Sequence, residues 1–483
     1  MNFLFCLLAA ILVQTQKDFD MLQSHIDRAD EAGESGIDIH LAPGIFFFHE
    51  GHISFVDRSL PGFAINIDGD GTVIVGESAD STYRLGQGFV DLKTLSDYDP
   101  SDDVKWARFW PLKVPFRKDV YCIPVKEPDM SEEEAKDIYI VLSQWFQGKI
   151  YKVLKISNGW MYFLREDKTG TRMHTELRFG RCLPRYIVCR PPERDDVYVC
   201  SASSFLSVKN SELGGVSFRG IKFLGNSDRD VLIHFKSSKA DSVVVEKCLF
   251  EGIRSNVLVF NDSGNLRYRD NRMVRCYRSG IVCDEESDNC QVTGSTFSCN
   301  GWMMVHNFNV QMQGSGFLVK NNVFEDFTYI GIGVGSHYTS DFERAQGVIC
   351  ENELSTTEKF RQGAPRMLID AGAIYTGTRN KDVVICHNYV HDIYGPHGNR
   401  GIFADDGAIN LTIYGNRVMN LSAQCISLRR VKRIAWRSNS KIKKVNVGNK
   451  VYDNVANGRI RLYVDPRDTS SYAYNNVRLK KVR

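Results

Sequence analysis

IDAGAIYTGTRNKDVVICHNYVHDIYGPHGNRGIFADDGAINLTIYGN, residues 369–416, contains two phrases twice. Asp370-Ala-Gly-Ala-Ile recurs 35 residues later as Asp405-Asp-Gly-Ala-Ile. A β-branched strand that runs into an asparagine recurs as Val383-Val-Ile-Cys-His-Asn388 and Leu411-Thr-Ile-Tyr-Gly-Asn416. Self-similarity at a regular spacing is the sequence signature of a repeat protein, so this stretch predicts successive coils of one solenoid.

The strand phrase continues through most of the chain after Gly215. It recurs as Gly220-Ile-Lys-Phe, Lys247-Cys-Leu-Phe, Asn271-Arg-Met, Gly294-Ser-Thr-Phe, Asn322-Val-Phe, Asn352-Glu-Leu, Asn388-Tyr-Val, Asn416-Arg-Val, Asn449-Lys-Val and Asn475-Asn-Val. Most steps are 23 to 30 residues long, and the LxxLxL pattern of leucine-rich repeats is absent. A buried asparagine in each coil can bond the next asparagine and otherwise unpaired backbone groups. The repeat therefore predicts an all-β chain folded as a parallel β-helix solenoid.

Three further segments complete the predicted organisation. Residues 17–87 open the solenoid, with an amphipathic helix from Phe19 to Ala32 that caps its first coil, and residues 205–483 form its main body. Residues 88–204 lack the repeat and are rich in aromatic residues, which predicts an inserted β-rich module. Its tryptophans either face a sugar or form the module's own core; they are Trp106, Trp110, Trp145 and Trp160.

Composition limits the function and the location. With 25% charged residues and a net charge of +3, the chain of 483 residues is not a general nucleic-acid binder. Residues 1–16 resemble a secretory signal peptide, which predicts a secreted or periplasmic protein, and the alternative is a buried first strand or helix. No later stretch is long and apolar enough to span a membrane. Of the 13 cysteines, Cys350 and Cys386 each precede a repeat asparagine by two residues, which predicts stacked core thiols, and no zinc-binding pattern occurs.

The repeated aspartates are the candidate catalytic pair. Asp370 follows Asn352 by 18 residues and Asp405 follows Asn388 by 17, which predicts equivalent places in adjacent coils, with backbones about 5 Å apart. Asp406 is a close alternative because it lies 18 residues after Asn388. Glycoside hydrolysis needs two such carboxyl groups. The other interpretation of these aspartates is turn capping or calcium binding.

Residues 17–87 and 205–483 resemble the right-handed parallel β-helix, or pectin-lyase-like, superfamily. The block formed by Asp370–Tyr375, Asn388–Asp392 and Gly401–Gly407 looks like one shared by secreted bacterial β-helical glycoside hydrolases of the fucosidase, xylanase and xylosidase types. Ala371, Phe403 and Ala404 depart from that block. The resemblance implies that Asp370 and Asp405 are catalytic. We expect substrate contacts from other residues in or near the block: His337, Tyr375, His391, Asp392 and Arg400.

The sequence therefore favours a secreted, monomeric glycoside hydrolase that acts on a complex polysaccharide without a metal or cofactor. One alternative is a calcium-dependent polysaccharide lyase, in which acidic residues hold the ion against a uronate and a basic residue removes the C5 proton. The candidate bases are Arg366, Arg379, Lys381 and Arg400. A second alternative is a non-catalytic β-helix that only binds carbohydrate.

Overall fold

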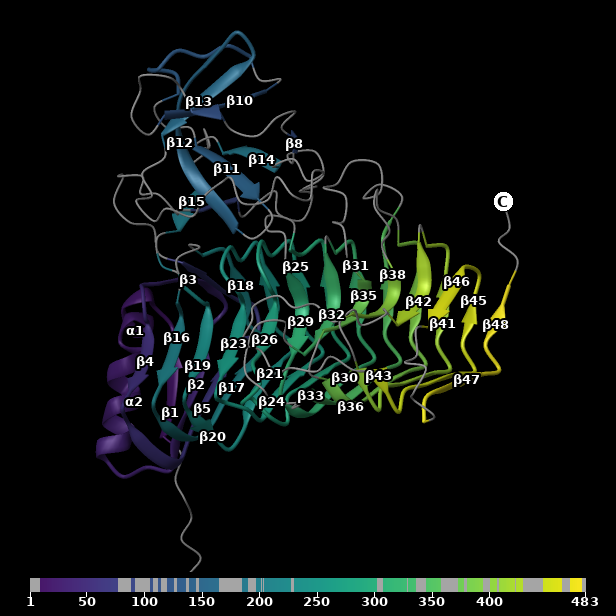
Figure 1. The fold of residues 1–483 in the computed structure, drawn as a ribbon. Coiled ribbons are helices and arrows are strands. Elements are labelled where there is room, and N and C mark those ends of the chain that lie inside the picture. Colours follow the sequence, from purple (N-terminus) through teal and green to yellow (C-terminus); the bar gives the residue numbers. More distant parts are fainter. Residues whose placement is uncertain are drawn as a thin grey trace, which may run out of the picture.

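The computed structural model describes residues 9–76, 88–91, 105–106, 112–113, 120–125, 128–135, 139–144, 147–164, 185–189, 197–200, 202, 204–226, 230–301, 307–327, 329–335, 345–357, 372–377, 380–393, 400–405, 408–421, 423–428, 446–462 and 470–479. These residues form a long parallel solenoid and a smaller antiparallel module (Figure 1). Among them, no helix is long and apolar enough to cross a membrane.

Each full coil of the solenoid adds one strand to each of three parallel sheets, which we call A, B and C. One coil passes through β36 (Asn380–Cys386) of sheet A, β37 (Tyr389–His391) of sheet B and β38 (Arg400–Ala404) of sheet C. The chain then re-enters sheet A at β40 (Thr412–Tyr414). The three stacks run side by side along the whole solenoid (Figure 1).

The other strands of the three sheets follow the same order. In sheet A they are β1 (Ala9–Val13), β2 (Gly36–Leu41), β5 (Ser59–Asp68), β17 (Glu212–Arg219), β21 (Val243–Glu246), β24 (Leu266–Arg269), β27 (Gln291–Thr293), β30 (Ser315–Lys320), β33 (Ala345–Cys350), β44 (Lys450–Tyr452) and β47 (Tyr472–Tyr474), with β20 (Lys239–Ala240), β39 (Ala408–Ile409) and β43 (Asn446–Val447) beside them. In sheet B they are β3 (Gly44–Phe48), β6 (Thr72–Gly76), β18 (Lys222–Leu224), β22 (Leu249–Glu251), β25 (Arg272–Val274), β28 (Thr296–Ser298), β31 (Val323–Glu325), β34 (Glu353–Ser355), β41 (Arg417–Met419), β45 (Val455–Ala456) and β48 (Val477–Arg478). In sheet C they are β4 (Ile53–Val56), β16 (Leu206–Lys209), β19 (Ile233–Lys236), β23 (Leu258–Asn261), β26 (Ile281–Cys283), β29 (Phe308–Met312), β32 (Ile330–Val334), β35 (Gly372–Thr376), β42 (Gln424–Leu428) and β46 (Arg459–Leu462).

A ladder of buried asparagines holds the corner between sheets A and B. The Oδ1 of Asn388 accepts from the backbone N–H of Asn352 at 3.0 Å and from its Nδ2 at 2.9 Å, and Asn416 accepts from Asn388 in the same way. The described ladder comprises Asn322, Asn352, Asn388, Asn416, Asn454 and Asn476. These bonds satisfy backbone groups that the turn of the corner leaves unpaired. The prediction of a parallel β-helix is confirmed.

Two predicted members of the ladder are wrong by a few residues. The sequence phrase indicated Asn449 and Asn475, whereas the ladder passes through Asn454 and Asn476. Asn449 instead precedes a strand of sheet A, where its Oδ1 accepts from the N–H of Leu411 at 2.9 Å. An asparagine followed two residues later by a hydrophobic residue thus occurs at two different corners of the coil.

Apolar side chains that alternate along the strands fill the interior of the solenoid. Equivalent aromatic rings stack between coils, as in Phe223 on Phe250 at 5.2 Å and Phe297 on Phe324 at 4.7 Å between ring centroids. Cys350 and Cys386 also pair in register, but on the outer face of sheet A, because Ile349 and Ile385 take the inward positions. The predicted burial of these thiols is confirmed, and the predicted core position is wrong.

Two helices cover the first coil, where the sequence predicted a single helix from Phe19 to Ala32. Helix α1 (Gln16–Asp20) begins at a capping box between Thr15 and Asp18, and α2 (Leu22–Glu31) buries Leu22, Ile26 and Ala29. Burial of each of these side chains but Ala29 contributes about 1.5–3 kcal/mol. The apolar stripe of the helices therefore closes the end of the core.

The structure places part of the predicted signal peptide in the fold. Residues Ala9–Val13 form β1, which pairs with β2 over its whole length, and Val13 is fully buried. Gln16 adds two 2.8 Å hydrogen bonds to the backbone of Phe47. These contacts match the alternative of a buried first strand, and cleavage at residue 16 stays a prediction.

The inserted module is an antiparallel sheet of strand order β8-β14-β11-β12-β13-β10-β9. The strands are β8 (Lys105–Trp106), β9 (Leu112–Lys113), β10 (Val120–Pro124), β11 (Tyr139–Gln144), β12 (Gln147–Ser157), β13 (Trp160–Leu164) and β14 (Arg185–Cys189), and β7 (Gly88–Asp91) pairs with β15 (Val197–Cys200). The insertion leaves the solenoid intact because β16 pairs directly with β4 and β18 with β6. The module has its own small core, formed by Ile123, Ala135, Val153, Ile156, Met161 and Phe163.

Candidate active site on sheet C

The candidate site lies on the outer face of sheet C at β35 and β38. In these strands Ile374 and Ile402 pair in register and point into the core, so the next residues, Tyr375 and Phe403, point outward. Both outward rings are nevertheless buried, with Tyr375 4% exposed and Phe403 0%. The outer face of sheet C is thus covered at this point. The same register position two strands further along is Arg461 of β46, which is exposed.

A buried carboxyl group follows β38 and meets the tyrosine of the preceding coil. The hydroxyl of Tyr375 donates to Oδ2 of Asp405 at 3.1 Å, and Asp405 is 5% exposed. The backbone N–H of Asp405 donates to the carbonyl of Thr376 at 2.9 Å, which continues the ladder of sheet C by one residue. Tyr375 and Asp405 therefore form a pair held by both the sheet and their side chains.

Arg400 supplies a positive charge at the opposite end of β38. Its guanidinium lies 3.9 Å from the centroid of the Phe403 ring, and its Nε donates to Oε1 of Gln424 on β42 at 2.9 Å. The rings of Phe403 and Tyr375 meet edge to face at 5.4 Å. An aromatic row therefore connects the cation to the buried carboxyl group.

The register of sheet C corrects the predicted equivalence of the two aspartate phrases. Gly372 of the first phrase pairs with Arg400 at the start of β38, whereas Asp405 follows the end of that strand. Ala408 and Ile409 of the second phrase lie in β39, beside sheet A. The described residues of the two phrases thus occupy different places in their coils. The expected backbone separation of about 5 Å involves Asp370, so it stays a prediction. Asp370, Asp406 and His337 lie outside the described residues, so their catalytic or binding roles stay predictions.

His391 and Asp392 lie on a different face from the Tyr375–Asp405 pair. His391 ends β37 of sheet B, where Nδ1 is 2.7 Å from Oδ2 of Asp392 and Nε2 is 3.0 Å from Oε1 of Glu353. Asp392 has φ 54° and accepts from Nδ2 of Asn420 at 3.2 Å. Asp326 and Asn420 adopt the same left-handed conformation at the equivalent corner, so the geometry gives Asp392 a structural use. Substrate contact by either residue stays a prediction.

Sequence reasoning missed several residues of the site. Gln424, which holds Arg400, and Phe403, which connects Arg400 to Tyr375, were not predicted to act there. A signal was present in the sequence, because Ile374-Tyr-Thr, Ile402-Phe-Ala and Ile426-Ser-Leu align without a gap. Within the described part of the chain, no three metal-binding side chains gather as a metal site would require.

No family model and no curated protein matches this chain. It is similar to several solved structures. A structure named glycoside hydrolase is 12% identical, with 97% of this chain and 96% of that chain covered and a TM-score of 0.48. A mutant of the periplasmic alginate epimerase AlgG is 10% identical, with 97% and 85% covered and a TM-score of 0.36. A mutant tailspike protein of E. coli bacteriophage HK620, in complex with a pentasaccharide, is 11% identical, with 96% and 64% covered and a TM-score of 0.37. Similarities at this level assign no role to any residue of this chain.

Proposed function

We propose that this protein is a glycoside hydrolase that cleaves a complex polysaccharide, with Asp405 as one of its two carboxyl groups. The observation that carries the proposal is the buried Asp405 carboxyl, held at 3.1 Å by the Tyr375 hydroxyl beside an aromatic row and a fixed arginine. Carboxyl groups with few contacts to water and a specific partner are typical of catalytic positions. Aromatic rings beside them can pack on the apolar face of a sugar.

In this proposal Asp405, which accepts the hydrogen bond from the Tyr375 hydroxyl, acts as the ionised group. An ionised carboxylate attacks the anomeric carbon directly or removes a proton from the attacking water. The other carboxyl group must then donate a proton to the leaving oxygen, and Asp370 and Asp406 are the two candidates. Because carboxyl groups about 5–5.5 Å apart give retention and groups about 6.5–9.5 Å apart give inversion, product stereochemistry reports which geometry the pair adopts.

The test is digestion of a polysaccharide panel, followed by both reducing ends and the ultraviolet absorbance of unsaturated uronates. We expect new reducing ends without absorbance and without an effect of chelator. Asp405→Asn should lower the rate by about 10²–10⁴-fold, the range for loss of a general acid or base. Tyr375→Phe should lower it by about 10–100-fold, because the lost hydrogen bond to a charged group is worth about 1.5–3 kcal/mol.

Asp382→Asn is the matched control. Asp382 lies on β36 in the preceding part of the same coil and is exposed, and its Oδ1 accepts from Nδ2 of Asn410 at 2.8 Å. This variant should retain full activity. Absorbance that disappears with chelator would identify a calcium-dependent lyase instead, and Asp405→Asn at the wild-type rate would remove Asp405 from the mechanism.

A further inference from the structure

Strand β13 of the inserted module separates its aromatic residues between two faces. Met161 and Phe163 are fully buried and belong to the module's core. Trp160 and Tyr162 alternate with them and therefore lie on the opposite face, where both are half-buried. Of the two alternatives for the tryptophans, a place in the module's core is therefore wrong for Trp160. Trp110 and Trp145, and the side chain of Trp106, lie outside the described residues.

The face that carries Trp160 and Tyr162 extends over three neighbouring strands. The register places Trp160 between Pro124 of β10 and Ser157 of β12. In the next row, Tyr162 lies between Cys122 and Lys155. Lys155 Nζ is 5.3 Å from the centroid of the Tyr162 ring. We call these six residues the Trp160 face.

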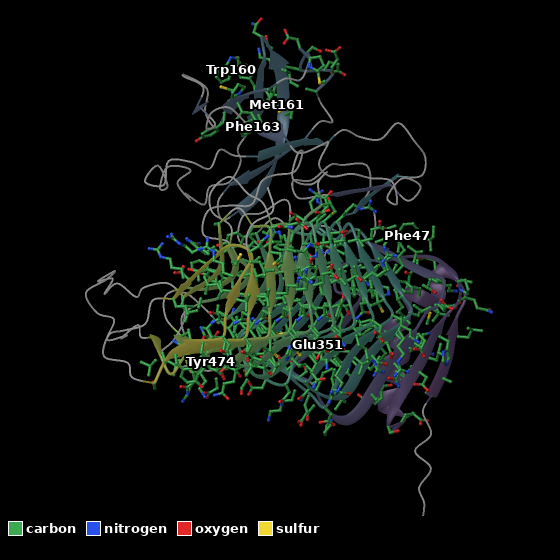
Figure 2. All side chains as sticks on the ribbon, turned by 90° about the vertical axis from the view of Figure 1, so that its right-hand side faces the viewer. Phe47, Trp160, Met161, Phe163, Glu351 and Tyr474 are labelled. Carbon is green, nitrogen blue, oxygen red and sulfur yellow. The ribbon has the colours of Figure 1, made fainter. Side chains whose placement is uncertain are left out.

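Trp160 lies outside the hydrophobic core of the module. Within the described residues, the Trp160 ring stacks on no other ring, and its indole N–H has no hydrogen-bond partner. Figure 2 places Trp160 farther from the solenoid than Phe163, at the outer end of the module. A half-buried tryptophan and a half-buried tyrosine in one row, outside both hydrophobic cores, offer a surface for interaction.

The chemistry of the Trp160 face fits a sugar chain. Side chains at i and i+2 of a strand are about 7 Å apart on one side, so Trp160 and Tyr162 offer two separate ring surfaces in a row. Beside them stand a hydroxyl, Ser157, and one positive charge, Lys155, and Leu164 and Val120 form the next row on the same side of the sheet. Sugar rings combine an apolar C–H face with hydroxyl or carboxylate edges, which matches this mixture.

We propose that the Trp160 face is a second, non-catalytic binding site for the polysaccharide, with Trp160 and Tyr162 stacked on sugar rings and Lys155 and Ser157 bonded to their polar edges. The proposal rests on the proposed function in that the polymer held is the one that sheet C cleaves. Lys155 makes anionic polymers the tighter ligands. Their retention should fall as salt rises.

The experiment is affinity electrophoresis of the full chain in gels that contain xylan, dextran, polygalacturonate or alginate. Wild-type protein should be retarded, and Trp160→Ala and Tyr162→Ala should each weaken retention by on the order of tenfold. Trp160→Phe should restore most of it, because the ring surface remains. Tyr472→Ala is the matched control, since Tyr472 is 46% exposed and has Lys450 at 5.8 Å but no tryptophan beside it among the described residues.

The outcomes separate the two proposals. Wild-type protein that migrates freely in all four gels would overturn the Trp160 face, as would alanine variants retarded like wild type. If Trp160→Ala loses retention while Asp405→Asn cleaves at the wild-type rate, the hydrolase proposal fails and the binding site stands. If Asp405→Asn loses cleavage while Trp160→Ala keeps retention, only the binding site is refuted.

Discussion

Replacing Asn388 by alanine should destabilise the coils around it. Its Nδ2 donates to the carbonyls of Ile349 and Cys386 and to Asn416, all at 3.0 Å, and its Oδ1 accepts twice from Asn352. Without this side chain the backbone N–H of Asn352 loses its acceptor in a site where Asn352 is 1% exposed. An unsatisfied buried donor costs about 1–3 kcal/mol, and the space left by the side chain adds to it. We expect a loss of about 3–5 kcal/mol.

Hydrogen exchange measured by mass spectrometry is the suitable assay, because a solenoid can open locally without unfolding as a whole. Peptides from β33 and β36 should exchange faster in Asn388→Ala by on the order of 10²–10⁴-fold. Asn66→Ala is the control: Asn66 also makes two side-chain hydrogen bonds, to Asp38 and Ser217, but on the partly exposed outer face of sheet A. Its cost should stay near 1 kcal/mol. Equal exchange in the two variants would refute the ladder as a source of stability.

Three further predictions follow from the described residues. Burial and the neighbouring His49 lower the pKa of His52 from 6.5 to about 3, so the unfolded chain binds the proton first as the pH falls. The stability that the neutral ring contributes is therefore complete above pH 6.5 and falls by about 1.4 kcal/mol per pH unit as the pH drops towards 3. Urea unfolding of His52→Phe should show a correspondingly flatter pH dependence, and parallel curves for the two proteins would contradict this. Of the cysteines whose burial the structure describes, Cys122 and Cys299 are half-buried, and the buried ones are Cys248, Cys276, Cys283, Cys290, Cys350, Cys386 and Cys425. Iodoacetamide and peptide mass spectrometry should therefore find the first two modified in the native protein and the other seven only after denaturation; rapid native labelling of any of the seven would be inconsistent with their burial. Removal of residues 1–16 deletes β1, buried Val13 and the Thr15 cap, which should cost about 3 kcal/mol in urea unfolding, whereas an unchanged midpoint would favour their role as a cleavable leader.

The parallel β-helix could be predicted from the sequence because the repeated asparagine has a structural role in every coil. One asparagine per coil, at the end of an alternating strand, is needed wherever a buried corner leaves backbone groups unpaired. The phrase alone could not separate Asn454, at that corner, from Asn449, which starts the next strand, because both precede a hydrophobic residue by two positions. Only the pairing of strands distinguishes the two corners.

The site was harder to predict than the fold for the same reason. Asp370 and Asp405 each begin an Asp-x-Gly-Ala-Ile sequence, and this identity suggested equivalent positions in successive coils. The register pairs Ile374 with Ile402, so the sequences that correspond in space are those around Tyr375 and Phe403. The repeated phrase indicated Asp405 as a candidate. Its hydrogen bond with Tyr375 joins two successive coils, so it could not be predicted without the register between them. Long connections before β35 and β38 change the count between repeat asparagines and hide this alignment.

The most direct test of the account is the rate of polysaccharide cleavage by Asp405→Asn beside Asp382→Asn, measured as new reducing ends with chelator present. The account predicts a loss of at least about 10²-fold in Asp405→Asn and no loss in Asp382→Asn. Wild-type cleavage by Asp405→Asn, or cleavage that yields unsaturated uronates and stops with chelator, would contradict it.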